Sequence, residues 1–325
     1  YTGGTGVDIV TLKTGTALTI AISLGAGDDT LIFDAAVTGS TAALSGGEGD
    51  DTLSMTATRA AALDAAPQTF YTSFERLTIN DGAAGETIDL ANLGFTDYVT
   101  TTGNKSTTFL DALDAGDNDL DTISFIYNGT LYTTTAADLD DADGINTAID
   151  NAVGVDKITA TFANGIDIVL TVDNAGDSIL GGTYTDATDA DTIATNTALT
   201  LQKMDSGGTL VLAGTGAVTV EVTDADEVAN TTDVLNIVAN VASANYNYGL
   251  VTVTNVETVN ISATDTVPVV SGNASIQTSS LTLTADKATT VDLGTSNANV
   301  NLTLTGTTKA TLIDGSDMTG ALTVT

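Results

Sequence analysis

Three short phrases of glycine and aspartate near the start of the sequence carry its clearest chemistry. Residues 3–10 and 46–53 match the opening of the nonapeptide G-G-x-G-x-D-x-U-x at every fixed position, where U is a large apolar residue. Residues 24–31 match it except that Leu24 replaces the first glycine. Glycine permits positive φ, so carbonyl oxygens can turn towards one centre, and the aspartate adds a carboxylate. Because Ca²⁺ prefers about six to eight oxygen ligands, the phrases predict calcium sites.

The predicted ligands are the carboxylate of the motif aspartate in each phrase and the carbonyls of the adjoining glycine turn. They are Gly4, Gly6, Asp8, Gly25, Gly27, Asp29, Gly47, Gly49 and Asp51. The three aspartates recur every 21 or 22 residues, which suits one coil of a solenoid per phrase. Asp28 and Asp50 come one place earlier, and we expect them to point outward or to bridge a neighbour.

Ordinary glycine-aspartate turns between strands are the alternative interpretation of these phrases. A single match would be compatible with such a turn. Three matches at nearly constant spacing favour stacked loops that share cations between neighbouring coils.

The charge balance points to the same ligand. The chain has 42 acidic and 8 basic residues and no histidine, giving a net charge of −34. This charge repels nucleic acid and anionic membranes, whose binding needs clusters of lysine and arginine. It also destabilises a compact chain unless cations are taken up. We therefore expect no nucleic-acid partner and no membrane insertion.

The residue types that are absent exclude several kinds of site. Without cysteine the chain forms no disulfide, thiolate metal site or cysteine nucleophile, and without histidine it holds no H-E-x-x-H protease motif. No stretch is long and apolar enough to span a bilayer. An enzyme on a β-helix usually needs basic and aromatic side chains, but here tryptophan is absent and the basic residues are scattered. We expect no enzymatic activity.

The elements around these residues predict a mostly β fold, a right-handed parallel β-solenoid with an inserted small α+β module. Residues 1–100 are expected to form the calcium-binding roll and solenoid, residues 101–190 the insert, and residues 191–325 a threonine-rich solenoid. In the last part, short β-rich runs recur about every ten residues, as expected for successive faces of a parallel β-helix. The phrase at 74–79 recurs at 256–261, which favours a repeated coil unit.

The insert is predicted from local signals. Asn128-Gly129 predicts a hairpin after the strand run 123–127. A helix is expected to begin with Thr135 as its N-cap, and residues 158–162 and 166–172 to form a second hairpin. The apolar face of that helix comprises Leu139, Ala142, Ile145, Ile149 and Ala152.

The insert is also rich in aspartate, and its spacing invites comparison with an EF-hand. Asp117, Asp119 and Asp121 have the right separation, but Thr122 replaces the turn glycine and Asn128 replaces the bidentate glutamate. We therefore predict a solvated acidic surface here, with weak cation uptake at most.

The sequence resembles the RTX-type surface-layer (S-layer) proteins of alphaproteobacteria. The resemblance covers residues 1–100 and 235–325 and rests on the three phrases, on Phe74-Glu75-x-Leu77, on 255–266 and on 279–283. It implies a lattice-forming β-solenoid that is secreted by a type I system and binds calcium within coils and between subunits. The insert departs from the family pattern, so lattice geometry does not carry over.

Two functions follow as expectations. The first is a structural block of a calcium-dependent two-dimensional lattice on the surface of a bacterial cell. Its partners would be copies of itself and a cell-surface glycan or lipopolysaccharide anchor reached through a region outside this chain. The alternative is a spacer or ligand-binding segment of a secreted RTX adhesin.

Overall fold

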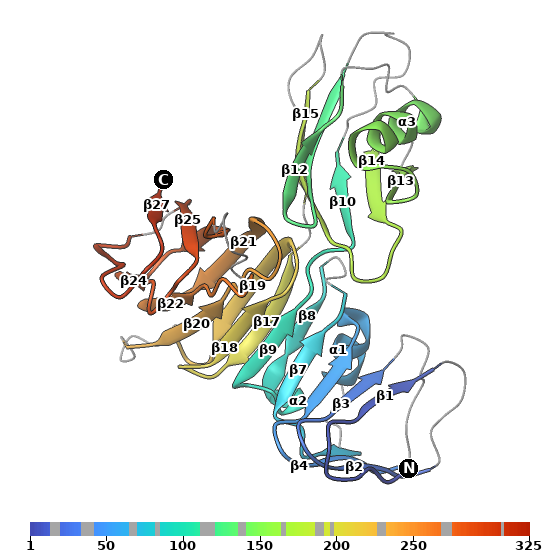
Figure 1. Ribbon diagram of the computed structural model, residues 1–325, viewed down its shortest axis with the longest axis vertical. Helices are drawn as coiled ribbons and strands as arrows, with labels where there is room; N and C mark the ends of the chain where they lie inside the picture. The colour runs from blue at the N-terminus through green and yellow to red at the C-terminus, as the bar shows by residue number, and fades with distance from the viewer. Residues whose placement is uncertain are drawn as a thin grey trace.

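The computed structural model describes residues 1–13, 20–33, 42–64, 70–81, 85–110, 121–135, 141–163, 167–185, 192–195, 198–225, 232–267, 275–306 and 309–325. Strands make up 51% of the structure and helices 9%, so the fold is mostly β, as predicted. Three parallel sheets form one part of the molecule and an antiparallel sheet forms the other (Figure 1).

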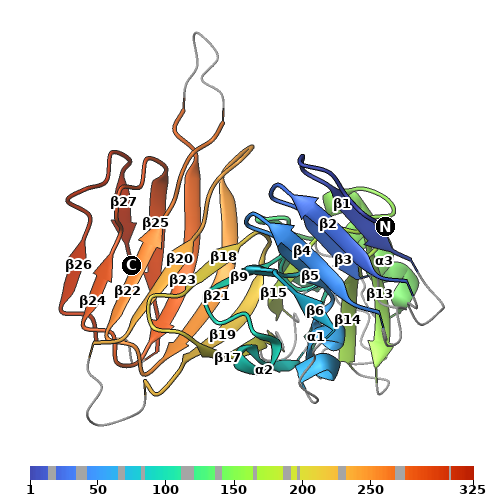
Figure 2. The same ribbon diagram turned by 90° about the horizontal axis from the view of Figure 1, so that it is seen from below.

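We call the three parallel sheets together the parallel stack. Its ten-stranded sheet contains, in order, β1 (Ile9–Leu12), β3 (Thr30–Phe33), β5 (Thr52–Met55), β7 (Arg76–Ile79), β9 (Tyr98–Thr101), β18 (Thr209–Leu212), β20 (Val234–Val238), β22 (Thr258–Ser262), β24 (Thr290–Asp292) and β26 (Leu312–Asp314). Figure 2 shows these strands running side by side along the molecule.

The second face of the stack is divided between two sheets. A three-stranded sheet contains β2 (Ile22–Ala26), β4 (Leu44–Glu48) and β6 (Tyr71–Thr72). A seven-stranded sheet contains β8 (Thr87–Asp89), β17 (Leu199–Met204), β19 (Gly216–Val222), β21 (Tyr246–Thr254), β23 (Thr278–Ala285), β25 (Asn299–Leu304) and β27 (Leu322–Val324). The chain alternates between the ten-stranded sheet and this second face, as in a solenoid or roll. The strands predicted at short intervals near the C-terminus therefore lie on alternate faces.

The core of the stack is a column of aliphatic side chains in register. Each member pairs with the next in neighbouring strands of the ten-stranded sheet, and each is at most 2% exposed. Because side chains alternate along a strand, this register keeps one set inside in every coil. The column comprises Leu31, Leu53, Leu77, Val99, Leu210, Ile237 and Ile261.

Two helices lie within residues 1–100, for which a roll and solenoid were predicted, and neither helix was itself predicted. Helix α1 (Ala57–Asp64) buries Ala57, Ala60 and Leu63 against the core. Helix α2 (Leu90–Leu93) is capped by the side chain of Asp89, which accepts the N–H groups of Ala91 and Asn92. Helix α1 forms because its apolar residues pack against the core, and Asp89 stabilises α2 as its N-cap.

The antiparallel sheet and one helix form what we call the antiparallel module. Its sheet order is β12-β11-β15-β16-β10-β14-β13, and its own hydrophobic cluster includes Phe109, Phe125 and Leu170. Figure 1 shows the module projecting from the parallel stack, which it contacts at its base, where the N–H of Asn247 donates to the carbonyl of Gly129 at 3.1 Å. The elements are β10 (Ser106–Phe109), β11 (Thr122–Tyr127), β12 (Thr130–Thr133), α3 (Ala142–Val153), β13 (Ile158–Ala163), β14 (Asp167–Val172), β15 (Ile179–Thr185) and β16 (Thr192–Thr195).

The two hairpins predicted in the module are present, but the predicted start of its helix is wrong. Asn128 and Gly129 both have positive φ between β11 and β12, and β13 pairs with β14. Helix α3 begins at Ala142, because Asp141 rather than Thr135 is its N-cap and accepts the N–H of Gly144 at 2.7 Å. Ile145 and Ile149 are buried as expected. Leu139 lies outside the described residues.

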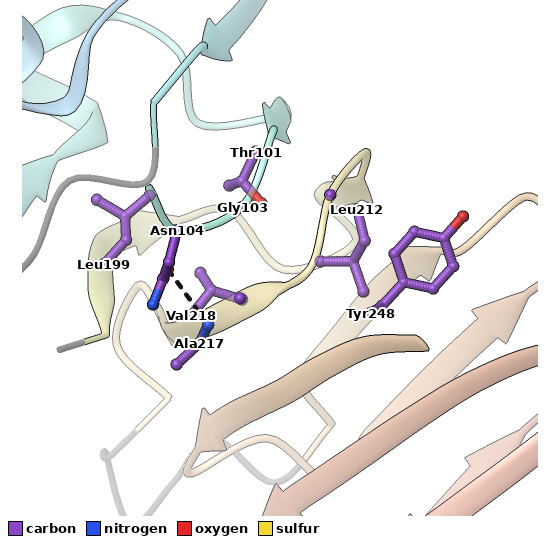
Figure 3. Close-up of a pocket in the computed structure, with 10 residues that line it drawn as sticks. Thr101, Gly103, Asn104, Leu199, Leu212, Ala217, Val218 and Tyr248 are labelled. Carbon is purple, nitrogen blue, oxygen red and sulfur yellow. Dashed lines mark hydrogen bonds between the residues drawn. The ribbon is translucent and has the colours of Figure 1, made fainter. Parts of the chain in front are cut away.

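The chain leaves the parallel stack at Asn104, whose side chain is buried. Asn104 donates its N–H to the carbonyl of Thr215, and its own carbonyl accepts the N–H of Ile179. Its side-chain oxygen accepts from Ala217 at 3.4 Å beside a small cavity (Figure 3). Most of the cavity lining is apolar core and glycine, so it offers packing rather than chemistry. The labelled apolar residues are Leu199, Leu212, Ala217, Val218 and Tyr248.

Candidate metal centre

The three glycine-aspartate phrases lie directly over one another at the N-terminal end of the stack. Gly25 pairs with Gly47 between β2 and β4, and Gly25 also lies against the carbonyl of Gly4. Gly25 and Gly47 have φ of 111° and 126°, a region that favours glycine. A Cβ at Gly47 would overlap the carbonyl oxygen of Gly25. The glycine turns whose carbonyl oxygens were predicted as metal ligands are therefore stacked from coil to coil.

The second glycine column has the same arrangement. Gly27 lies on Gly6 and Gly49 lies on the carbonyl of Gly27, and φ is positive at both Gly27 and Gly49. Gly4 and Gly6 belong to the outermost coil, where an added Cβ would meet no atom within 4 Å. The close contact between glycine turns is therefore present at Gly27 and Gly49, which lie against a neighbouring coil, and absent at Gly4 and Gly6.

The predicted aspartates form a column joined by hydrogen bonds. The backbone N–H of Asp8 donates to Oδ1 of Asp29 at 2.7 Å, and the N–H of Asp29 donates to Oδ1 of Asp51 at 2.8 Å. The N–H of Asp51 then donates to Oε2 of Glu75 at 2.9 Å. We call Asp8, Asp29, Asp51 and Glu75 the carboxylate column. The structure brings together all three predicted aspartates and adds a glutamate that was not predicted as a site residue.

The inner members of this column each have one carboxylate oxygen without a hydrogen bond. Asp29 is 1% exposed and Asp51 is 0% exposed, and neither Oδ2 has a partner. Burying an uncompensated carboxylate oxygen is costly. Burial raises the pKa of Asp51, and the charges of Asp29, Glu75 and Asp28 raise it further, although the N–H of Asp29 opposes them. A cation beside these oxygens would offset both the burial and the repulsion.

The neighbouring aspartates lie outside the column, where we expected them. Asp28 and Asp50 are both exposed, and the N–H of Asp50 donates to Oδ1 of Asp28 at 3.1 Å. Arg76 forms a salt bridge with Asp50 at 2.9 Å and lies over the ring of Tyr98 at 4.5 Å. Asp50 is therefore already paired with a side-chain cation.

The donor set fits a hard cation bound by mixed oxygens. Within the described residues, no three histidine, cysteine or acidic side chains converge as a metal cluster. Any ion here would need backbone carbonyls of the glycine turns as well as carboxylates. Ca²⁺ accepts this combination, whereas zinc prefers nitrogen and sulfur ligands. The geometry is compatible with the predicted ligand set.

The acidic part of the antiparallel module differs from the prediction at one position. Asp121 was expected on a solvated surface, but it is 3% exposed and accepts the hydroxyl of Tyr184 at 2.7 Å. The hydrogen bond compensates its burial. Asp117 and Asp119 lie outside the described residues.

Glu75 could have been found from the repeated phrase. Glu257 plays the same part in the second copy of the phrase, because its Oε2 accepts the N–H of Asp233 at 3.1 Å. In both cases the glutamate follows the aspartate by 24 residues. This equal spacing supports the repeated coil unit at 74–79 and 256–261.

No protein-family model matches the chain, and no curated protein matches it. The resemblance to S-layer proteins therefore rests on the residues that carry it. Among the described helices, none has the length and apolar character needed to cross a membrane.

Proposed function

We propose that this protein is a structural, non-enzymatic block of a calcium-dependent S-layer. The carboxylate column supports the calcium part of the proposal most directly. Asp29 and Asp51 hold buried oxygens without partners in the two coils where the predicted phrases stack. A chain with 42 acidic and 8 basic residues also cannot neutralise itself through salt bridges.

In this proposal calcium links folding to assembly. Asp8, Asp29 and Asp51 would hold the ion through carboxylates, helped by carbonyls of the adjoining glycine turns. Ca²⁺ would neutralise the column within a chain and bridge acidic side chains between chains. Monovalent salt can only screen such charges. Assembly should therefore depend on divalent cations.

The resemblance supplies the remaining parts of the proposal. They are a right-handed coil, secretion by a type I system and residence on the bacterial cell surface. An anchor to a surface glycan or lipopolysaccharide would lie in a region outside this chain. The long in-register sheets support a rigid, repeatable unit of the kind that a lattice requires.

A comparison of two salts tests the lattice. Purified protein should stay dispersed in sodium chloride and form sheets when millimolar calcium is added at the same ionic strength. Light scattering and negative-stain electron microscopy would measure the outcome. Protein that remains as dispersed rods in calcium would reject the proposed two-dimensional lattice.

The antiparallel module supports the alternative of an RTX adhesin segment. It has its own core and projects from the parallel stack, as a ligand-binding domain on a spacer would (Figure 1). An adhesin spacer would bind calcium and stiffen yet remain monomeric. The same experiment therefore separates the two functions.

A further inference from the structure

We propose that a further cation site lies between the third phrase and the following coil, which contains no glycine-aspartate phrase. Its ligands would be Oδ2 of Asp51, the carbonyl of Ser73 and the carboxylate of Glu75. The inference rests on the proposed calcium function, because it extends the same column by one step. It adds two ligands, Ser73 and Glu75, that lie outside the motif.

Two oxygens meet at Gly46. An ideal Cβ on Gly46 would overlap the carbonyl oxygen of Ser73 and come within 2.5 Å of Oδ2 of Asp51. Both oxygens therefore lie close to a single point. Two oxygen ligands of one Ca²⁺ are separated by at most about 5 Å, so the pair satisfies the distance that one ion requires.

The same arrangement occurs between the first and second phrases. An ideal Cβ on Gly3 would overlap the carbonyl of Leu24 and approach Oδ2 of Asp8. Leu24 and Ser73 thus present their carbonyls in equivalent ways, although only Leu24 belongs to a phrase. The coil after the third phrase reproduces the oxygen geometry without the sequence.

The backbone at Ser73 has positive φ although Ser73 is not a glycine. Ser73 has φ of 55°, in the left-handed region that non-glycine residues rarely occupy. Such conformations cost free energy and occur often at binding sites. Here the turn directs the Ser73 carbonyl at Gly46.

Glu75 supplies the second carboxylate. Its Oε2 accepts the N–H of Asp51 at 2.9 Å, just as Asp51 accepts from Asp29 one coil earlier. Oδ2 of Asp51 is fully buried and has no hydrogen-bond partner, which independently points to cation binding at this oxygen. An ion here would join the phrase-bearing coils to β7 and the rest of the stack.

Terbium provides a probe that counts such sites, because it replaces calcium and is excited through nearby tyrosines. Luminescence titration of the full chain should show one site fewer in Glu75→Gln than in the wild type. Glutamine keeps an oxygen that can accept the Asp51 N–H, so the fold should persist. Glu221→Gln removes the same charge from β19 and should leave the number of sites unchanged.

Equal numbers of sites in Glu75→Gln and the wild type would overturn this inference and leave the calcium proposal standing. A wild-type chain that binds no ion would overturn the calcium proposal itself. If Glu75→Gln fails to fold, lanthanide-soaked wild-type crystals decide the matter. An anomalous peak between Asp51, Ser73 and Glu75 is expected, and peaks confined to the first two gaps would refute the site.

Discussion

The backbone N–H of Asp29 donates to Oδ1 of Asp51 at 2.8 Å, although the two residues are 22 positions apart. This bond fixes one carboxylate oxygen of Asp51 and leaves the other buried without a partner. Asp29 and Asp51 therefore each accept a hydrogen bond from the preceding coil with Oδ1, and each has a buried Oδ2 that could bind a cation. In the proposed function, calcium binding and coil stacking would therefore depend on the same side chains.

Asp51→Asn should weaken the response of stability to calcium. Asparagine keeps an acceptor for the Asp29 N–H but removes the charge that holds the ion. At calcium concentrations of ten to a hundred times Kd, each site contributes about 1.4 to 2.7 kcal/mol, and the variant should lose this amount. The measurement is the free energy of unfolding with calcium and with excess chelator. Asp50→Asn, at an exposed position, should respond to calcium like the wild type.

Gly47→Ala should be far more damaging than Gly4→Ala. The alanine Cβ at 47 would overlap the carbonyl of Gly25 at a φ of 126°, whereas at 4 it would meet nothing within 4 Å. We expect a loss of about 3 kcal/mol or more at 47 and little change at 4. Thermal unfolding in calcium measures both. Similar stabilities in the two variants would contradict the close stacking of these turns.

Leu53→Ala should destabilise the stack by about 2 to 5 kcal/mol, because it opens a cavity in the aliphatic column. Leu53 is fully buried and lies in register between Leu31 and Leu77. Thr52→Ala, at the neighbouring and less buried position of β5, provides the control and should cost less than about 1 kcal/mol. Chemical denaturation of both variants in calcium is the measurement. Equal losses of stability in the two variants would argue against the buried aliphatic column.

The stability that the Asp89 N-cap gives to α2 should depend on pH. Partial burial alone would raise the pKa of Asp89, but the Lys203 ammonium and the N–H groups of Asn92 and Ala91 outweigh it and lower the pKa. The stabilising contribution is therefore complete above the unfolded pKa and is lost as pH falls through the lower folded pKa. Asp89→Ala should cost about 1 kcal/mol at neutral pH.

The difference in stability between the wild type and Asp89→Ala should shrink as the solution becomes more acidic than the ordinary aspartate pKa. Unfolding curves recorded through the acid range measure it. A difference that stays constant down to the most acidic samples would show that ionised Asp89 does not stabilise the cap.

The features that follow from local chemistry could be predicted from the sequence. Asn128-Gly129 specifies a turn by its own backbone preference, and the phrases specify theirs through glycine. Helix α1 escaped prediction because it depends on burying Ala57 and Leu63 against distant strands. The repetition of its phrase at 256–261 marked Glu75, but its contact with Asp51, 24 positions earlier, exists only in the folded chain.

The point at which the antiparallel module enters has a consequence for the evolution of the chain. Strand β9 pairs directly with β18, and β8 pairs directly with β17, so the ladders continue across the interruption. The chain leaves at Asn104 and resumes at Leu199, on adjoining coils of the same scaffold. A different domain could occupy this junction without shifting any register on either side. The strand register of the stack therefore does not depend on the domain that is inserted at this junction.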